Sequence, residues 1–237
     1  MGMPSTINLA QGNAKEEDIN EVFSYFHYID NKFSTYKKDS EISRINRREI
    51  RKEEWSREME KIMSLCEKTK KETEGYFDIN IKGLMDPSGL VKGYAILEGA
   101  KILRKRGYKN FFVEIAGDIQ ADGFSKKGEK WKIGIQNPFD SRQVIKIVQL
   151  SNMGIATSGT YIRAGHINNP KSGKPADEIA AITVIGPDVY EADRFATAAF
   201  AMGEKGINFI ENLNGFEGYM VKKNKKAVMT RGFHNYL

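Results

Sequence analysis

The spacing of apolar side chains predicts a chain of mixed helices and strands. Apolar residues at helical intervals over residues 15–33 predict a helix with one buried face; they are Ile19, Val22, Phe23, Phe26, Ile29 and Phe33. The same spacing predicts a second helix over 52–73 and a third over 92–106, closed by Gly107 as the residue after its C-cap. Residues 40–46 are polar-rich and are predicted to form a turn.

Shorter apolar runs, separated by turn residues, predict the strands. They are expected over residues 76–79, 111–115, 119–123, 131–136, 144–150, 154–157, 180–185, 216–222 and 227–230. Two further helices are expected, over 187–202 and 205–213. Helices and strands do not alternate strictly, so the pattern predicts an α+β fold with a mostly antiparallel sheet flanked by helices. No repeat or linker divides residues 1–237, which are expected to form a single unit.

Composition excludes several classes of protein. Hydrophobic residues make up 40% of the 237 and charged residues 29%, which excludes a disordered polymer and a membrane bundle. No run of 18 apolar residues is present, so no membrane span is expected. The single cysteine, Cys66, excludes an intramolecular disulfide and a multi-cysteine zinc site.

The net charge of +6 suits anionic partners in general, such as phosphates, nucleic acids and membrane surfaces. Basic and acidic residues are interleaved, most densely over residues 47–71, which indicates a solvated helix surface and no nucleic-acid partner. The first twenty residues show neither a signal peptide nor a lipobox. A cytoplasmic chain and the mature part of an exported protein are both compatible with this.

Asp193 and Thr197 are four residues apart on a predicted helix. That spacing places a carboxylate and a hydroxyl on one helix face. Hard oxygen ligands at such a separation suit Mg²⁺, which binds through few protein groups together with substrate phosphates. A purely structural pair remains the alternative, because the spacing alone is common.

Three other segments carry candidate chemistry. Thr157 and Ser158 follow a predicted strand, where hydroxyls and backbone amides can bind phosphate oxygens. Lys92 lies between two glycines that permit close approach of the backbone, and it offers a cation to a phosphate. His166 lies in a polar loop and could act as a general base near neutral pH. A turn, a solvated lysine and a surface histidine are the structural alternatives.

The order and the amino-acid sequences of seven segments resemble those of one known family. The segments are residues 36–46 (YKKDSEISRIN), 75–78 (GYFD), 89–95 (GLVKGYA), 116–119 (AGDI), 156–159 (ATSG), 166–175 (HINNPKSGKP) and 192–197 (ADRFAT). Together they resemble the ApbE family of flavin transferases, and the last three segments at their mutual spacing are the most specific. The resemblance implies a fold similar to the tunnelling-fold proteins, with FAD bound in a cleft.

The resemblance also implies an activity. Family members are Mg²⁺-dependent FAD:protein FMN transferases, which cleave FAD, attach FMN through a phosphoester to Ser or Thr of a partner protein, and release AMP. It implies that Asp193, Thr197 and the carbonyl of Gly89 bind the metal and that His166 activates the acceptor hydroxyl. The residues it implies for the FAD site are Tyr36, Tyr76, Phe77, Asp78, Asp86, Lys92, Thr157, Ser158, Ile167 and either Met1 or Met3.

Two alternatives share this site: a Mg²⁺-dependent FAD pyrophosphatase that yields FMN and AMP, and an FAD-binding protein without catalysis. The loop after His166 departs from the family pattern, because Asn169 stands where the family usually has Asp. The change removes a negative charge close to the expected base, which keeps the pyrophosphatase alternative open.

Overall fold

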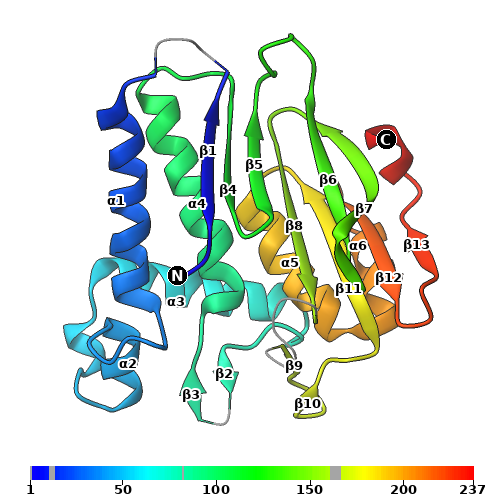
Figure 1. The fold of residues 1–237 in the computed structure, drawn as a ribbon. Coiled ribbons are helices and arrows are strands. Elements are labelled where there is room, and N and C mark those ends of the chain that lie inside the picture. Colours follow the sequence, from blue (N-terminus) through cyan, green and yellow to red (C-terminus); the bar gives the residue numbers. More distant parts are fainter. Residues whose placement is uncertain (1, 11–13, 82, 161–166) are drawn as a thin grey trace.

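A seven-stranded antiparallel sheet forms the centre of the molecule, seen in a computed structural model that describes residues 2–10, 14–81, 83–160 and 167–237 (Figure 1). Its strands, in spatial order, are β1 (Ser5–Leu9), β4 (Phe111–Ile115), β5 (Asp118–Asp122), β8 (Met153–Gly159), β11 (Ile179–Gly186), β12 (Glu217–Lys222) and β13 (Ala227–Met229). Every neighbouring pair is antiparallel. The predicted α+β class is confirmed.

Three hairpins accompany the main sheet: β2 (Asn80–Ile81) with β3 (Leu84–Met85), β6 (Trp131–Asn137) with β7 (Asp140–Leu150), and β9 (Asn168–Asn169) with β10 (Lys174–Pro175). Alternate residues of β6 are buried, so its apolar side packs on the outer face of the main sheet. There Ile133 and Ile135 share a hydrophobic cluster with Ile119 and Ile155.

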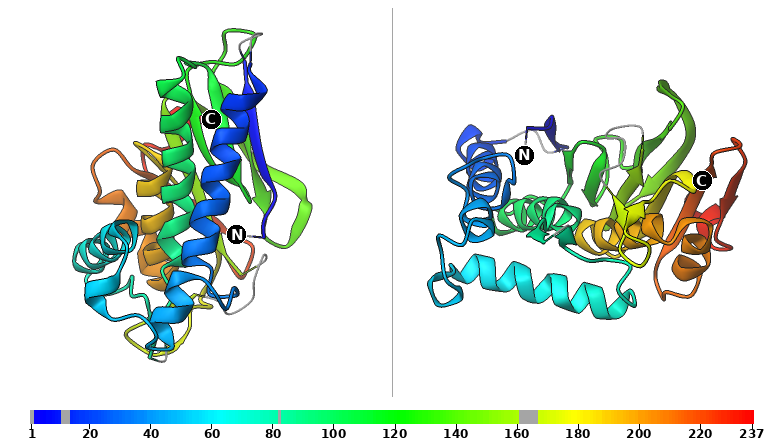
Figure 2. Two further views of the ribbon diagram at one scale, coloured as in Figure 1. Left: turned by 90° about the vertical axis from the view of Figure 1, so that its left-hand side faces the viewer. Right: turned by 90° about the horizontal axis from the view of Figure 1, so that it is seen from below.

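The helices cover the opposite face of the sheet (Figure 2). They are α1 (Glu16–Phe33), α2 (Glu41–Asn46), α3 (Arg57–Glu72), α4 (Ser88–Lys105), α5 (Val189–Ala201) and α6 (Gly206–Glu211), with short 3₁₀ turns at Lys52–Glu54, Gly203–Lys205 and Phe233–Tyr236. The α4 and α5 helices lie between the sheet and α3. No helix in the described part of the chain is long and apolar enough to cross a membrane.

Local chemistry explains two differences from the sequence prediction in the first half of the chain. Residues 41–46 form α2 and not a turn, because Ser40 accepts a hydrogen bond from the Ser43 amide (3.2 Å) as an N-cap and Ile42 and Ile45 are buried. The second helix begins at Arg57, since Ser56 caps it by accepting from the Met59 amide (3.2 Å).

Three other features differ from the sequence prediction: one predicted strand is absent from the described residues, one helix begins earlier, and one strand was not predicted. Residues 76–79 form no strand, because the amide of Phe77 donates to the Thr73 hydroxyl (3.1 Å) and prolongs the turn after α3. The third helix begins at Ser88, so Gly89 lies in its first turn and not before it. The edge strand β1 was not predicted, since its alternation of half-buried and exposed residues spans only five positions.

Candidate active site

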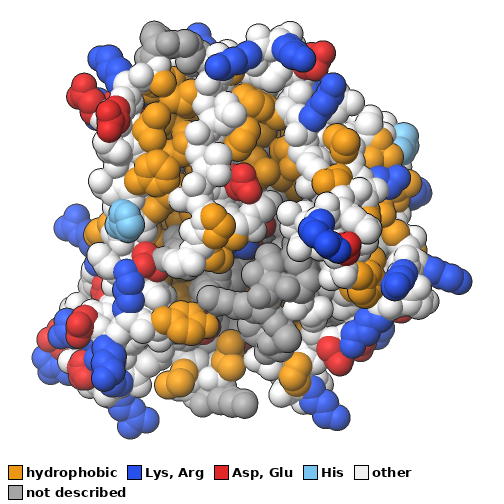
Figure 3. Space-filling view, in the orientation of Figure 1, with side chains coloured by type: hydrophobic (Ala, Val, Ile, Leu, Met, Phe, Trp, Pro, Cys, Tyr) orange, Lys and Arg blue, Asp and Glu red, His pale blue; other side chains and the backbone are white. Residues whose placement is uncertain are grey.

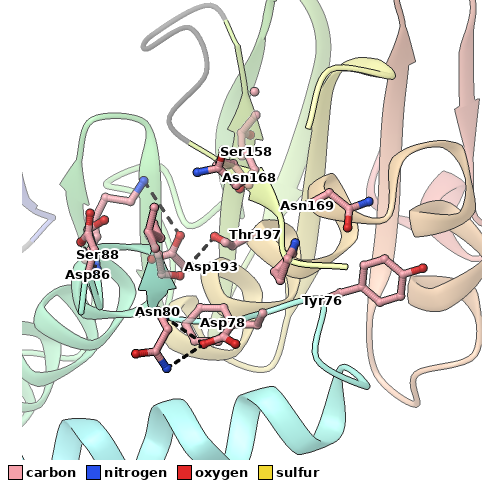
Figure 4. A pocket seen from close by; sticks show the side chains of 18 of the residues that line it. Tyr76, Asp78, Asn80, Asp86, Ser88, Ser158, Asn168, Asn169, Asp193 and Thr197 are labelled. Carbon is pink, nitrogen blue, oxygen red and sulfur yellow. Dashed lines mark hydrogen bonds and ion pairs between the residues drawn. The ribbon is translucent and has the colours of Figure 1, made fainter. Parts of the chain in front are cut away.

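A cleft of about 290 Å³ opens where the N-terminal part of α4, the middle of α5 and the end of β8 meet (Figure 4). The segment between α3 and β2 and the β9–β10 hairpin complete its walls. Its lining residues are Met3, Tyr76, Phe77, Asp78, Asn80, Ile81, Asp86, Ser88, Gly89, Lys92, Ala116, Thr157, Ser158, Gly159, Ile167, Asn168, Asn169, Pro170, Gly173, Asp193 and Thr197.

Two glycines allow α4 to approach α5 closely at this point. A Cβ at Gly89 would lie 2.9 Å from Thr197 Cγ2, and one at Gly93 would lie 2.7 Å from Asp193 Cβ. Because neither glycine has a Cβ, the Gly93 amide can donate to Asp193 Oδ2 (2.8 Å) and the Thr197 hydroxyl can donate to the Gly89 carbonyl (3.1 Å). The predicted metal ligands Gly89, Asp193 and Thr197 are therefore brought together.

Two buried carboxylates flank one lysine on the floor of the cleft. The Lys92 ammonium lies 2.6 Å from Asp118 Oδ2 and 3.9 Å from Asp193 Oδ1. Burial raises the pKa of Asp193, the Asp118 carboxylate raises it further, and Lys92 opposes the change. A cation that enters the cleft would therefore stabilise the ionised form of this buried carboxyl group.

The end of β8 is held in place by the same carboxylate. Asp118 Oδ1 accepts a hydrogen bond from the Thr157 amide (3.0 Å), and the Thr157 hydroxyl lies 2.8 Å from the Thr183 hydroxyl on β11. Ser158 also lines the cleft (Figure 4). The hydroxyl-bearing turn expected from the sequence is thus a strand end that faces the cleft.

The opposite wall combines aromatic and acidic groups. Tyr76 and Phe77 line it, and the Lys171 ammonium lies 4.4 Å from the centre of the Tyr76 ring. Although burial opposes the change, hydrogen bonds from Lys70 and Asn80 lower the pKa of Asp78. Asp78 therefore carries a negative charge into the cleft at neutral pH.

Asp86 anchors the start of α4 beside this wall. One of its carboxylate oxygens accepts a hydrogen bond from the Ser88 amide (3.0 Å), which is one of the free N–H groups at the helix N-terminus. Ile167, before β9, lines the cleft and packs against a hydrophobic cluster around α5.

Asn169 has a structural role in the β9–β10 hairpin. Its side-chain oxygen accepts hydrogen bonds from the amides of Lys171 (2.9 Å) and Ser172 (3.3 Å). An amide and a carboxylate present the same acceptor oxygen to such a turn. The departure from the family pattern at this position therefore preserves the hairpin.

Most of the residues predicted for the site line the cleft. The Tyr36 side chain is 78% exposed, in the turn after α1, and is not among the lining residues, so its contact with FAD stays a prediction. His166 and Met1 lie outside the described residues, and Met3 does line the cleft.

Sequence reasoning did not include Asp118 among the site residues. It stands in the segment AGDI at residues 116–119, directly after a strand and a glycine, and it contacts both Lys92 and Thr157. The signal available in the sequence was a carboxylate directly after a strand. That this carboxylate is buried follows from the pairing of β5 with β8, which the sequence alone does not show. Asp118 is not itself a lining residue, whereas Asn80, Ser88 and Asn168 line the cleft and were not predicted from the sequence.

The donor set fits a hard divalent cation. Asp193, Thr197 and the Gly89 carbonyl offer three oxygen atoms of different kinds, and Mg²⁺ is usually bound by one or two carboxylates together with substrate phosphates and water. Among the described residues no cluster of three His, Cys, Asp or Glu side chains could hold a metal.

Buried Arg194 fixes α5 to its neighbours. The guanidinium is 3% exposed, pairs with Glu72 on α3 and with Glu191, and lies 3.9 Å from the centre of the Phe195 ring. A bidentate cation held on an aromatic face restricts rotation of the helix. This network helps to aim the adjacent Asp193 at the cleft.

Sequence comparison identifies relatives over most of the chain. The model of the ApbE family matches residues 1–86 and 84–220. A protein named FAD:protein FMN transferase from Haemophilus influenzae is 26% identical, with 91% of this chain and 81% of that protein aligned. A protein of the same name from Vibrio cholerae is 32% identical, over 59% of this chain and 45% of the relative.

Solved structures share the fold over the whole chain. The flavin transferase ApbE from Vibrio cholerae superposes with a TM-score of 0.86 at 25% identity, covering 100% of this chain and 96% of that structure. An ApbE protein from Thermotoga maritima gives a TM-score of 0.86 at 21% identity, covering 99% and 96% of the two chains.

Proposed function

This chain belongs to the ApbE family, and from that premise we propose that it is a Mg²⁺-dependent FAD:protein FMN transferase that modifies a Ser or Thr hydroxyl of a partner protein. The observation that carries the proposal is the meeting of the Asp193 carboxylate, the Thr197 hydroxyl and the Gly89 carbonyl in one cleft. We also propose that residues 1–237 act as one catalytic unit, because the cleft is built from segments between Met3 and Thr197.

The proposed reaction is a phosphoryl transfer. The acceptor hydroxyl oxygen attacks the phosphorus of the FMN half of FAD, and a new P–O bond forms. The bond from that phosphorus to the bridging oxygen breaks, and AMP leaves with the electron pair. The hydroxyl proton passes to a base, so the products are FMN-protein and AMP.

Three oxygen donors are proposed to hold the cation beside the pyrophosphate: Asp193, Thr197 and the carbonyl of Gly89. When bound, Mg²⁺ neutralises negative charge that develops on the transferring and leaving phosphates. Lys92 is proposed to add a second positive charge, and Asp118 holds its ammonium group at 2.6 Å. The protein thus concentrates positive charge where the substrate is most negative.

The remaining lining residues are proposed to bind the rest of FAD. Tyr76 and Phe77 offer ring faces to an aromatic group of the substrate. Asp78, Asp86 and Ile167 also line the cleft, and Thr157 and Ser158 are proposed to face the phosphates. Tyr36 is proposed to reach the flavin from its exposed position after α1.

We expect His166→Ala to slow FMN transfer by about 10²- to 10⁴-fold, because a Ser or Thr hydroxyl is a weak nucleophile without a base. Binding of FAD and Mg²⁺ should be unchanged. Single-turnover transfer and FAD fluorescence titration measure the two effects separately. A normal transfer rate in the variant would remove His166 from the base role.

The direct test of the proposed function is an acceptor-labelling reaction. The protein is mixed with FAD, Mg²⁺ and candidate acceptor proteins, and mass spectrometry is used to find an FMN-sized gain on a Ser or Thr residue. Free FMN and AMP formed without any acceptor would favour the pyrophosphatase alternative. FAD that stays intact with Mg²⁺ present would favour a binding protein.

Asn169 provides a smaller test of the same alternatives. We expect Asn169→Asp to leave the ratio of transfer to hydrolysis unchanged, because either side chain can cap the hairpin turn. Asn169→Ala removes two hydrogen bonds and should lower the free energy of unfolding by about 1 kcal/mol. A shift from hydrolysis to transfer in the Asp variant would show that the missing charge controls the reaction.

A further inference from the structure

A second hollow of about 280 Å³ lies on the outer face of the sheet, away from the helices. It lies between the outward side of β4 and the β6 strand of the β6–β7 hairpin. We call it the β6 groove, and its lining residues are Phe112, Glu114, Ala116, Gly117, Ile119, Trp131, Lys132, Ile133, Gly134, Ile135, Gln136, Ile155 and Thr157. Figure 3 shows apolar side chains gathered over β4 and β5 on this face.

The β6 groove adjoins the active-site cleft. Ala116 and Thr157 line both hollows. At the other end of the groove, the rings of Phe112 and Trp131 meet edge to face with their centres 5.1 Å apart. One end of the groove therefore lies beside the place where the transfer is proposed to occur.

One wall of the groove is a strand edge. Six consecutive residues of β6, 131–136, line it. Within the described residues, β6 pairs with β7 alone, so its other edge offers backbone N–H and C=O groups. Such an edge is a template for an added strand, which is a recurring mode of peptide recognition.

The floor of the groove combines apolar side chains with a carboxylate. Isoleucines from β5, β6 and β8 make most of it apolar, but the Glu114 carboxylate also lines it, half-buried. Burial raises the pKa of Glu114, a hydrogen bond from the Gly117 amide opposes the change, and the Asp118 carboxylate raises the pKa further. A carboxyl group among apolar side chains is stabilised when a ligand supplies a hydrogen-bond donor.

We propose that the β6 groove binds the extended segment of the acceptor protein that flanks its target hydroxyl, as a strand added to the free edge of β6 with a donor directed at Glu114. This inference rests on the proposed transferase function, which requires a polypeptide to place a hydroxyl in the cleft. The acceptor chain must then leave the cleft on both sides of that hydroxyl, and the groove begins at Thr157.

The free edge of β6 is long enough to pair with a short peptide. A strand of six residues spans roughly 20 Å, so an acceptor segment of similar length could pair along residues 131–136. Backbone pairing would give affinity with little dependence on sequence, and the apolar floor would select side chains at alternate positions. The groove would therefore recognise residues near the target hydroxyl and not the hydroxyl itself.

The test uses Glu114→Trp, which fills the groove with a bulky side chain and removes its carboxylate. Glu114 lines the groove but not the cleft, so FAD binding should be unchanged in the variant. Unchanged FAD binding also serves as the check that the variant is folded. Glu114→Gln removes the charge and keeps the size. Glu53→Trp, the same substitution at an exposed site on the 3₁₀ turn before α3, is the matched control.

The probe is a library of short synthetic peptides with a central Thr, incubated with FAD and Mg²⁺ and read by FMN-sized mass gain. We expect the full-length protein to prefer apolar residues at alternate positions on one side of the Thr. Glu114→Trp should raise the KM for these peptides at least about tenfold with little change in kcat, whereas Glu53→Trp should not. Glu114→Gln should show a smaller increase in KM.

Three results would overturn the inference, and they differ in what they imply for the transferase. If Glu114→Trp labels the same peptides with an unchanged KM, the groove is not the docking site and the transferase function stands. If the protein labels no peptide and produces no FMN-protein from any acceptor, the proposed function fails together with the inference. Labelling of whole proteins but of no peptide would show that an extended segment is insufficient, which also overturns the inference.

Discussion

Asp193→Asn is expected to reduce metal-dependent FMN transfer by about 10³-fold or more, which corresponds to about 4 kcal/mol of transition-state stabilisation. The Asn side chain keeps the volume of Asp and can still accept the hydrogen bond from the Gly93 amide. What it loses is the negative charge that is proposed to bind the cation. The loss of activity should therefore arise from metal binding and not from a change in the fold.

The folded state of the same variant should be at least as stable as that of the unmodified protein, although the activity falls. Burial raises the pKa of Asp193 above its value in the unfolded chain. As the pH rises past the ordinary pKa of Asp, the unfolded chain ionises first, so the metal-free folded state loses stability. Asn carries no such penalty, and urea denaturation at neutral pH with EDTA should give a free energy of unfolding at least as large as that of the unmodified protein.

The matched control lies five residues earlier on the same helix. Asp188 is the N-cap of α5 and accepts a hydrogen bond from the Glu191 amide (2.9 Å), a role that Asn fulfils equally well. Asp188→Asn should keep both activity and stability. Mn²⁺ binding followed by electron paramagnetic resonance should be lost only in Asp193→Asn, and unchanged Mn²⁺ affinity there would remove Asp193 from the metal site.

Gly154→Ala should have the largest effect on stability. A Cβ at Gly154 would lie 2.0 Å from the Val189 nitrogen and 2.1 Å from the Asp188 carbonyl carbon. Both are backbone atoms, so no side-chain rotation relieves the overlap, and β8 must separate from the start of α5. We expect a loss of about 3 kcal/mol or more in the free energy of unfolding.

Displacement of α5 should also disturb the site, since Asp193 and Thr197 lie one and two turns after the point of collision. Gly134→Ala on β6 is the control, because its Cβ would meet only the methyl groups of Val144, at 3.1 Å. Thermal unfolding of both variants, with Mn²⁺ binding as a second measurement, checks the prediction. Equal stability of the two would show that the close approach of β8 and α5 is not required.

Much of the fold could be predicted because its signals are local. The apolar stripe of α1 and the strands β4 and β6 follow directly from periodicity over a few residues. The α2 helix was missed because a polar-rich segment of six residues gives little periodicity, and only the burial of Ile42 and Ile45 reveals its inner side. Strand β1 was missed for a similar reason, since its stability comes from pairing with β4.

The part of the site that is proposed to bind the metal could be predicted because two of the proposed ligands are close in sequence. Asp193 and Thr197 share a helix face whatever the fold, so their spacing alone places both oxygens together. Their third partner, the Gly89 carbonyl, came from resemblance to the family, and a backbone oxygen has no signature in a single sequence. Asp118 was not assigned, although it joins Lys92 to Thr157.

The sequence by itself determined most of the elements and the order of the motifs, because helical and strand periodicity and short motifs depend on neighbouring residues. The tertiary structure decided which motifs meet. Gly93 and Asp193 are 100 residues apart, and their hydrogen bond forms only because glycines let α4 and α5 approach. The β6 groove likewise arises from the packing of a hairpin on a sheet, since contacts between distant segments leave no local pattern in the chain.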